Sequence, residues 1–154
     1  MDLGDLLAGD AIIPALKATS KKQVLQDLSE HAAGITGLSA HDIFSRILQR
    51  ERLSSTGLGR GIAVPHAKLG SLKSIVGIFA RLDQPIDFES PDQEPVDLIF
   101  LLLSPEHASG DHLKALAKIS RIVRDSQSLE QLRAAPDQAA LKHLLTAPPA
   151  SHAA

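Results

Sequence analysis

An apolar run near the middle of the chain is the feature that most restricts the fold. It reads PVDLIFLLLSP between Pro95 and Pro105, and the six residues from Leu98 to Leu103 are apolar without interruption. A run of this length between two prolines predicts a β-strand, and its continuous apolar character predicts burial on both faces. The run is far too short for a membrane-spanning helix, which needs about 20 residues. It therefore predicts the buried strand of a layered domain.

Segments of two other kinds surround this run. Short apolar stretches predict further strands, and Pro14 places the first of them at a sheet edge or interrupts it. Apolar residues at helical spacing predict five helices. The first helix has Ser20 and Gln23 in a capping-box pattern and ends at Gly34 or Gly37. Strands mixed with helices of this length indicate a single α/β domain. The predicted strands are residues 11–18, 62–64, 73–82 and 95–105, and the predicted helices are residues 20–37, 39–51, 111–124, 128–134 and 137–145.

The composition excludes several classes of function. The chain has no cysteine, which rules out disulfides, thiolate zinc sites and catalytic thiols. Its formal net charge is −2 and its only aromatic residues are four Phe, so no nucleic-acid partner is expected. The N-terminus is acidic where a signal peptide would be basic, and we predict a soluble, cytoplasmic protein without membrane insertion. Residues 1–145 are predicted to form the domain and residues 146–154 a flexible tail.

One segment concentrates glycines, hydroxyl groups and a histidine. It spells STGLGRGIAVPHAK from Ser55 to Lys68, and Pro65 fixes the backbone immediately before His66. His66 follows a predicted strand and is expected where the chain leaves the sheet, at the rim where ligands collect in α/β domains. His112 is predicted in the first turn of the helix after the buried strand, so the two imidazoles could meet if their strands are neighbours. The alternatives are that His112 caps its helix and that His66 is a structural histidine.

Several kinds of chemistry could use these histidines. A metal site would use His107, Asp111 and His112, whose spacing matches metal-binding patterns only weakly. Serine hydrolysis and nucleotide binding lack their motifs, because neither G-x-S-x-G nor Walker A spacing is present. Phosphoryl transfer fits better, because neutral imidazole is a nucleophile at neutral pH. The loop can offer N–H groups and hydroxyls to phosphate oxygens, and the guanidinium of Arg50 can pair with a phosphoryl group.

The same residues resemble a known family. Residues 50–68, RERLSSTGLGRGIAVPHAK, resemble the active-site signature of the fructose/mannitol-type enzyme IIA domains of the bacterial phosphotransferase system. Residues 95–120 are similar to the second signature of that family, and residues 6–29 are most similar to its stand-alone nitrogen-regulatory branch. The resemblance covers about residues 1–145. It implies an α/β sandwich in which helices flank a mixed central β-sheet.

The resemblance also implies a role for each candidate site residue. His66 would be phosphorylated, on its tele nitrogen, by a histidine phosphocarrier protein of the HPr or NPr type, which enzyme I charges from phosphoenolpyruvate. His112 would hydrogen-bond the phosphoryl group or the His66 ring without being phosphorylated itself. Arg50 would neutralise the phosphoryl charge, and Ser55 and Thr56 would support the loop. No cofactor and no metal is implied.

The expected function is therefore that of a regulatory phosphocarrier. Its phosphorylation state would be read by targets such as potassium transporters, sensor kinases or enzymes of stress signalling. The chain shows no fused IIB-like domain or membrane segment, which favours regulation over uptake. Three alternatives stay open: a sugar-uptake enzyme IIA that passes phosphate to a IIB protein, a metal-dependent hydrolase that uses His66, His107 and His112, and a binding module in which His66 has no chemical role.

Overall fold

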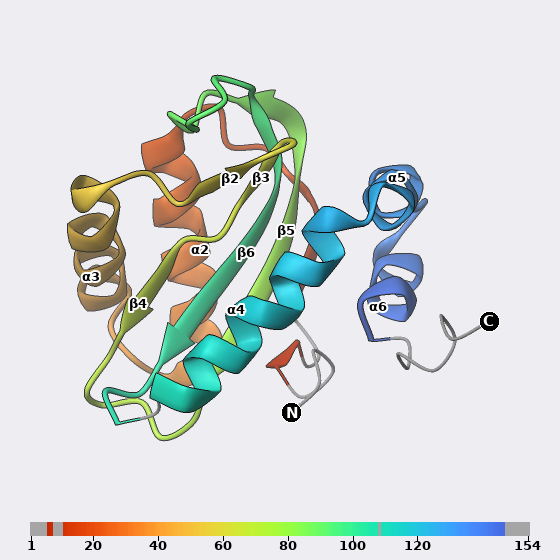
Figure 1. The fold of residues 1–154 in the computed structure, drawn as a ribbon. Helices are drawn as coiled ribbons and strands as arrows, with labels where there is room; N and C mark the ends of the chain where they lie inside the picture. Colours follow the sequence, from red (N-terminus) through yellow and green to blue (C-terminus); the bar gives the residue numbers. More distant parts are fainter. Residues whose placement is uncertain (1–5, 8–10, 108, 147–154) are drawn as a thin grey trace.

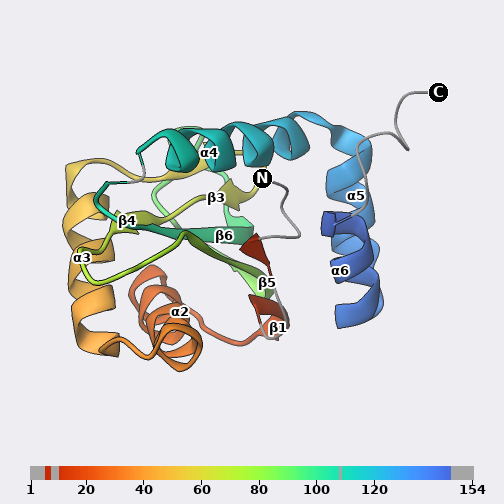
Figure 2. The same ribbon diagram turned by 90° about the horizontal axis from the view of Figure 1, so that it is seen from below.

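A mixed β-sheet lies at the centre of the structure, with helices on both of its faces (Figures 1 and 2). The computed structural model describes residues 6–7, 11–107 and 109–146. The six strands of the described sheet are β1 (Ile12–Leu16), β2 (Gly57–Gly59), β3 (Ile62–Ala63), β4 (His66–Lys68), β5 (Val76–Ile86) and β6 (Val96–Ser104). The helices within the same residues are α2 (Lys21–Thr36), α3 (Ala40–Leu53), α4 (Ser109–Arg124), α5 (Ser126–Ala134) and α6 (Gln138–Thr146). The predicted α/β fold with a mixed sheet is confirmed.

Strand β6 is the centre of the sheet. The strand order is β1-β5-β6-β3-β2, and β4 also pairs with β6. β6 runs antiparallel to β5 and parallel to β3 and β4, while β1 is an edge strand parallel to β5. Every residue from Leu98 to Ser104 is buried, as the uninterrupted apolar run predicts for a strand covered on both faces. Phe79 of β5 faces Phe100 of β6, and their rings meet edge to face with centroids 5.0 Å apart.

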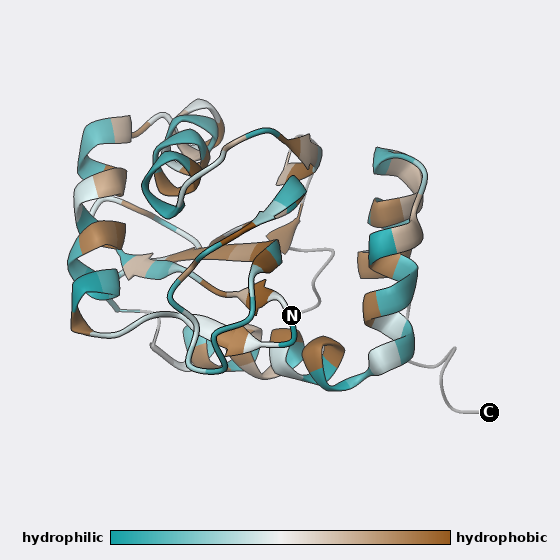
Figure 3. Ribbon diagram, turned by 90° about the horizontal axis from the view of Figure 1, so that it is seen from above, coloured by the Kyte–Doolittle hydropathy of each residue, from teal (hydrophilic) through white to brown (hydrophobic). Residues whose placement is uncertain are grey.

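The helices cover the sheet unevenly. α2 lies on one face and α4 crosses the other, α3 packs beside β4, and α5 and α6 stand beyond the β1 edge (Figure 2). The apolar sides of α5 and α6 face the sheet in Figure 3. The leucines that these two helices bury are Leu129, Leu132, Leu141 and Leu145. Arg81 of β5 ties this pair to the edge strand, because its guanidinium donates to the carbonyls of Pro14, Leu132 and Ala135. No helix within the described residues is both long and apolar enough to span a bilayer.

Capping residues set the ends of α2 and α3 much as their sequences predict. The hydroxyl of Ser20 accepts from the amide of Gln23 at the start of α2. The Gln23 side chain accepts from the Thr19 amide instead of completing a reciprocal box with Ser20. Gly37, with φ of 77°, ends the helix in the left-handed conformation that favours glycine. Ser39 caps α3 in turn.

Most boundaries differ from the sequence prediction by a few residues, such as those of β5, which is Val76–Ile86 rather than residues 73–82. α3 continues to Leu53 rather than ending near residues 50–51, because the exposed end of a helix needs no apolar residue to continue. The glycine-rich segment is not simply a loop: β2 and β3 form a hairpin whose turn residues Arg60 and Gly61 both have positive φ, as a tight type I′ turn requires. α6 ends at Thr146, one residue inside the predicted tail, and residues 147–154 lie outside the described residues.

Candidate active site

The sheet topology brings the two candidate histidines together. The sequence predicts that the chain leaves the sheet at His66, and this expectation is wrong. His66 is the first residue of β4, which pairs in parallel with β6 and places His66 opposite Leu102. His112 lies in the first turn of α4, the helix that follows β6 (Figure 1). The two imidazole rings meet edge to face with centroids 5.2 Å apart and an interplanar angle of 63°. The predicted meeting of the histidines is confirmed.

The partners of the half-buried His66 ring fix its tautomer. Its Nδ1 lies 2.9 Å from the carbonyl oxygen of Val64, which can only accept, so Nδ1 bears the proton. Its Nε2 lies 3.2 Å from Nε of Arg50, which can only donate, so Nε2 presents a lone pair. Both contacts indicate the same tautomer. The proline that precedes His66 keeps the backbone extended after Val64, which places the ring over that carbonyl.

Arg50 reaches His66 from the last turn of α3. Its Nη1 donates to the carbonyl oxygen of Ser54 at 3.0 Å and to the Ser54 hydroxyl at 3.4 Å, while its Nε faces the imidazole. A cation in the last turn of a helix also interacts favourably with the negative end of the helix dipole. The guanidinium is therefore held beside the Nε2 atom of His66 before any ligand arrives.

His112 is buried, with 8% of its surface exposed, and its Nδ1 lies 2.6 Å from the hydroxyl oxygen of Ser104. The alternative that His112 caps its helix does not describe this contact, because the partner of the His112 ring is the Ser104 side chain at the end of β6. Burial lowers the pKa of His112 from its ordinary value of 6.5, and the nearby His66 and Lys68 lower it further. His112 is thus neutral at pH 7.

This pKa shift predicts a pH dependence of stability. At pH values above 6.5, His112 is neutral in the folded and the unfolded chain. As the pH falls below that value, the unfolded chain binds the proton first, so the contribution of His112 to the free energy of unfolding is lost. We expect wild type to lose more stability than His112→Asn when urea unfolding is compared at pH values of about 7.5 and 5.5. Equal losses in the two proteins would contradict the predicted shift.

The hydroxyls of the predicted supporting loop are bonded to other parts of the protein. The Ser55 hydroxyl donates to the carbonyl oxygen of Phe88 at 2.9 Å and accepts from the amide of Gly57. The Thr56 hydroxyl donates to the carboxylate of Glu51, which also accepts from the Thr56 amide at 3.2 Å. The sequence prediction gives both residues a supporting role in the loop. In the structure, these bonds anchor the loop that follows α3.

Glu51 is a site residue that the sequence reasoning missed. Its side chain is 2% exposed and forms a 2.9 Å ion pair with Nζ of Lys21, which also lies over the ring of Phe88. A signal was present in the sequence, because Ile43, Ile47 and Glu51 follow one another at four-residue spacing on the buried side of α3. A carboxylate on an apolar stripe indicates a buried acid with a specific partner. That partner comes from α2 and could not be identified from spacing.

Two pairs of buried polar side chains hydrogen-bond to each other near the candidate residues in the chain. Within the described residues, the polar side chains that are buried are Ser29, Glu51, Thr56, Ser90, Ser104 and His112. Ser104 contacts His112, whose ring meets His66, and Thr56 contacts Glu51, which follows Arg50 in the chain. Burial of polar groups is costly unless they are hydrogen-bonded. These two pairs satisfy that requirement.

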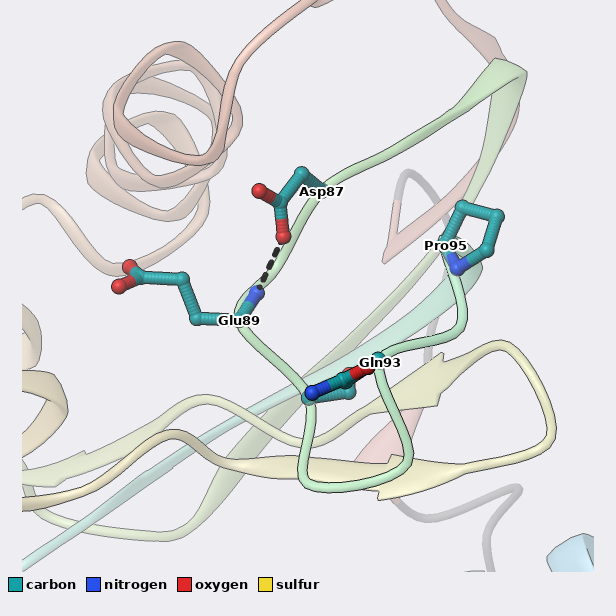
Figure 4. Close-up of a pocket in the computed structure, with 5 residues that line it drawn as sticks. Asp87, Glu89, Gln93 and Pro95 are labelled. Atoms are coloured by element: carbon teal, nitrogen blue, oxygen red, sulfur yellow. Dashed lines mark hydrogen bonds between the residues drawn. The ribbon is translucent and has the colours of Figure 1, made fainter.

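Within the described residues, the remaining histidines and acids do not assemble a second site. His107 lies exposed in the turn between β6 and α4, and no cluster of three metal-ligating side chains occurs within residues 6–7, 11–107 and 109–146. A pocket lined by Asp87, Glu89, Ser90, Gln93 and Pro95 lies beside the start of β6 (Figure 4). The histidines contact the other end of β6, at Leu102 and Ser104. One Asp87 carboxylate oxygen already accepts from the Glu89 amide.

Comparison with known proteins identifies the family. Residues 5–147 match the family described as "Phosphoenolpyruvate-dependent sugar phosphotransferase system, EIIA 2". The chain belongs to this family. The family resemblance found in the sequence is thereby confirmed over nearly the whole chain.

Relatives of this EIIA domain include proteins of its own size. The chain is 54% identical over 153 residues to a nitrogen regulatory protein of Bradyrhizobium diazoefficiens, covering 99% of this chain and 100% of the relative. The crystal structure of the nitrogen regulatory protein IIA-Ntr from Neisseria meningitidis superposes with a TM-score of 0.89 at 34% identity, covering 94% of this chain and 99% of that one. The fructose-specific EIIABC component of Bacillus subtilis is 31% identical over 142 residues, which are 92% of this chain but 22% of that protein.

Proposed function

We propose that this EIIA domain is a phosphocarrier of the nitrogen-regulatory kind. It accepts a phosphoryl group on Nε2 of His66 from a phosphohistidine carrier protein of the HPr or NPr type and regulates target proteins according to its phosphorylation state. The observation that carries the proposal is the lone pair of His66 Nε2, fixed by the Val64 carbonyl and held beside the guanidinium of Arg50.

The transfer step uses the tautomer that the structure shows. The P–N bond of the donor phosphohistidine breaks as a P–N bond forms to Nε2 of His66, and the leaving donor nitrogen keeps the electron pair. The proton on Nδ1 of His66 stays in place, so the phosphorylated ring is a cation whose N–H is hydrogen-bonded to the Val64 carbonyl. Onward transfer then releases a neutral imidazole, which is a good leaving group. The Val64 contact therefore supports both acceptance and release of the phosphoryl group.

Arg50 and the surrounding contacts supply positioning and charge. The N–H of Arg50 that donates to Nε2 in the free protein is released when the P–N bond forms, and it can then donate to a phosphoryl oxygen. Glu51 is already paired with Lys21, so its charge is compensated when the dianionic group arrives. Phosphoryl transfer depends mostly on such positioning and charge stabilisation.

Similarity to the relatives favours regulation over sugar uptake. The chain is 54% identical to a relative called a nitrogen regulatory protein and 31% identical to a fructose-specific EIIABC component. A phosphoryl group on His66 places up to about two negative charges on its oxygens while the ring becomes a cation, so the local net charge changes by about −1. The helices that carry Arg50 and His112, α3 and α4, also carry the exposed Leu53 and Leu113 side chains. A partner that binds this face would distinguish the two states. Candidate partners are the potassium transporters and sensor kinases that the resemblance implies.

The test is phosphoryl loading in a purified system. The chain is incubated with phosphoenolpyruvate, enzyme I and the phosphocarrier protein, and its intact mass is measured with and without the carrier. We expect one acid-labile, alkali-stable phosphoryl group per chain, and only with the carrier present. Absence of loading overturns the proposal. Loaded protein is then mixed with a fructose-type IIB protein: rapid transfer would support the sugar-uptake alternative, whereas retention of phosphate supports regulation.

Removal of the Arg50 guanidinium should slow loading. Charge-assisted hydrogen bonds contribute about 1.5–3 kcal/mol, so we expect Arg50→Ala to accept phosphate roughly 10- to 100-fold more slowly than wild type. Arg46→Ala is the matched control, since Arg46 lies one turn earlier on α3 and pairs with Glu106 at 3.6 Å. Initial rates by quenched-flow mass spectrometry would measure both. Equal rates for Arg50→Ala and Arg46→Ala would remove Arg50 from the mechanism.

A further inference from the structure

Within the described residues, the hydroxyl of Ser104 has a single hydrogen-bond partner, the ring of His112. Ser104 is the last residue of β6 and is fully buried. Its backbone is fixed by pairing with Lys68 of β4 and by the amide of Leu69, which donates to its carbonyl oxygen at 2.9 Å. Within the described residues, Nδ1 of His112 at 2.6 Å is the hydrogen-bond partner of its Oγ. The hydroxyl proton can therefore be used only toward that nitrogen.

This arrangement determines where neutral His112 bears its proton. A serine hydroxyl has a single proton to donate, and a neutral imidazole has one N–H and one bare nitrogen. If Nδ1 bore the proton, the hydroxyl proton of Ser104 would be buried without an acceptor, which is strongly disfavoured. Ser104 therefore donates to Nδ1, and the proton of His112 lies on Nε2. His66 has the opposite tautomer, with its proton on Nδ1 and a bare Nε2.

We propose that Ser104 is a positioning residue that fixes His112 in the Nε2–H tautomer, so that a neutral His112 donates this N–H to the phosphoryl group carried by His66. The inference rests on the proposed function, and it explains why His112 can donate a hydrogen bond from Nε2. The 5.2 Å separation of the ring centroids places the His112 ring against the ring that is proposed to accept phosphate. Without Ser104, the two tautomers of His112 would differ little in energy, and Nε2 would bear the proton only part of the time.

A neutral donor suits the charges around the site. The phosphorylated His66 ring is cationic, and Arg50 and Lys68 are nearby cations. A protonated His112 would repel the Arg50 guanidinium and the Lys68 ammonium group, whereas a neutral Nε2–H supplies a hydrogen bond without an added charge. Burial, His66 and Lys68 lower the pKa of His112, which is consistent with a neutral ring. Ser104 then decides which nitrogen of that neutral ring bears the proton.

The first test observes the tautomer directly. Imidazole ¹⁵N spectra of the unphosphorylated chain at mildly alkaline pH should show His112 as Nε2–H and His66 as Nδ1–H. Ser104→Ala should shift His112 toward a mixture of tautomers, and Ser104→Thr, which keeps the hydroxyl, should restore the wild-type pattern. Ser90→Ala is the matched control, because Ser90 is also a buried serine and its Oγ has no hydrogen-bond partner within the described structure. An Nδ1–H tautomer for His112 in wild type, or an unchanged tautomer in Ser104→Ala, overturns the proposal.

The second test measures the consequence for phosphoryl transfer. We expect Ser104→Ala to load His66 completely but about 3- to 10-fold more slowly than wild type, the size expected for loss of one neutral hydrogen bond. Ser104→Thr and Ser90→Ala should stay within about twofold of wild type. If wild type loads and Ser104→Ala loads at the same rate, the positioning role is refuted and the proposed function is not. Failure of wild type to load would refute the proposed function, and the ¹⁵N spectra would still decide the tautomer.

Discussion

Replacement of His66 by alanine should abolish phosphoryl loading completely, because it removes the imidazole nitrogen whose lone pair is held toward the Arg50 guanidinium. The other contacts of the site cannot substitute: His112 is buried, and its Nδ1 is bonded to Ser104. Intact-mass measurement after incubation with phosphoenolpyruvate, enzyme I and the carrier protein should therefore show no added phosphoryl group on His66→Ala.

His107→Ala is the matched control for this loss. His107 lies exposed in the turn after β6, so its removal should leave loading and stability at wild-type values. His66→Gln adds a second control, because it keeps a polar side chain of similar size but has no nucleophilic nitrogen. Full loading of either His66 variant would show that another residue accepts the phosphate. Loss of loading in His107→Ala would call for a different assignment of the histidines.

Replacement of Glu51 by alanine should cost about 3–5 kcal/mol of the free energy of unfolding, which is the range for breaking a buried ion pair on one side. Its side chain is 2% exposed, pairs with Lys21 at 2.9 Å and accepts from the amide and hydroxyl of Thr56. Removal leaves Lys21 with only its longer 3.4 Å pair to the exposed Glu89, and it leaves the amide and hydroxyl of Thr56 without their acceptor. Urea unfolding at neutral pH would show a lower transition midpoint with an unchanged slope.

A second variant and a surface control make the Glu51 prediction specific. Glu51→Gln keeps the shape and one acceptor oxygen but loses the charge opposite Lys21, so an intermediate loss is expected. Glu130→Ala, on the exposed side of α5, should change the free energy of unfolding by no more than about 0.5 kcal/mol. A loss below about 1 kcal/mol for Glu51→Ala would mean that solvent or another group replaces its contacts.

The elements of the fold were largely predictable because their signals are local. The apolar run of β6, the serine caps of α2 and α3 and the helical spacing of α4 each depend on residues close together in the chain. The β2–β3 hairpin was not predicted, since glycines at Gly57 and Gly59 present no side-chain pattern that could mark a strand. Its pairing follows from β3 lying beside β6, which is a long-range contact.

The candidate site, like the fold, was predicted only in part from the sequence. The types and order of the reactive residues predicted His66, His112 and Arg50, and the geometry places all three together. Ser55 and Thr56, to which the resemblance gives a supporting role in the loop, bond to Phe88 and Glu51 through their hydroxyls. Phosphorylation of His66 itself remains a prediction that the loading experiment tests.

The sequence by itself predicted a candidate nucleophile, His66, after a glycine-rich segment, an arginine upstream of that segment and a buried strand to carry the sheet. Only the tertiary structure decided which nitrogen of each histidine bears the proton, because that depends on the hydrogen-bond partners of each ring. For His66 they are the Val64 carbonyl and the Arg50 guanidinium, and for His112 the partner is Ser104 at the end of β6. Hydrogen bonds act over about 3 Å, so the Arg50 and Ser104 contacts are decided by the packing of α3, β4, β6 and α4 and not by spacing along the chain.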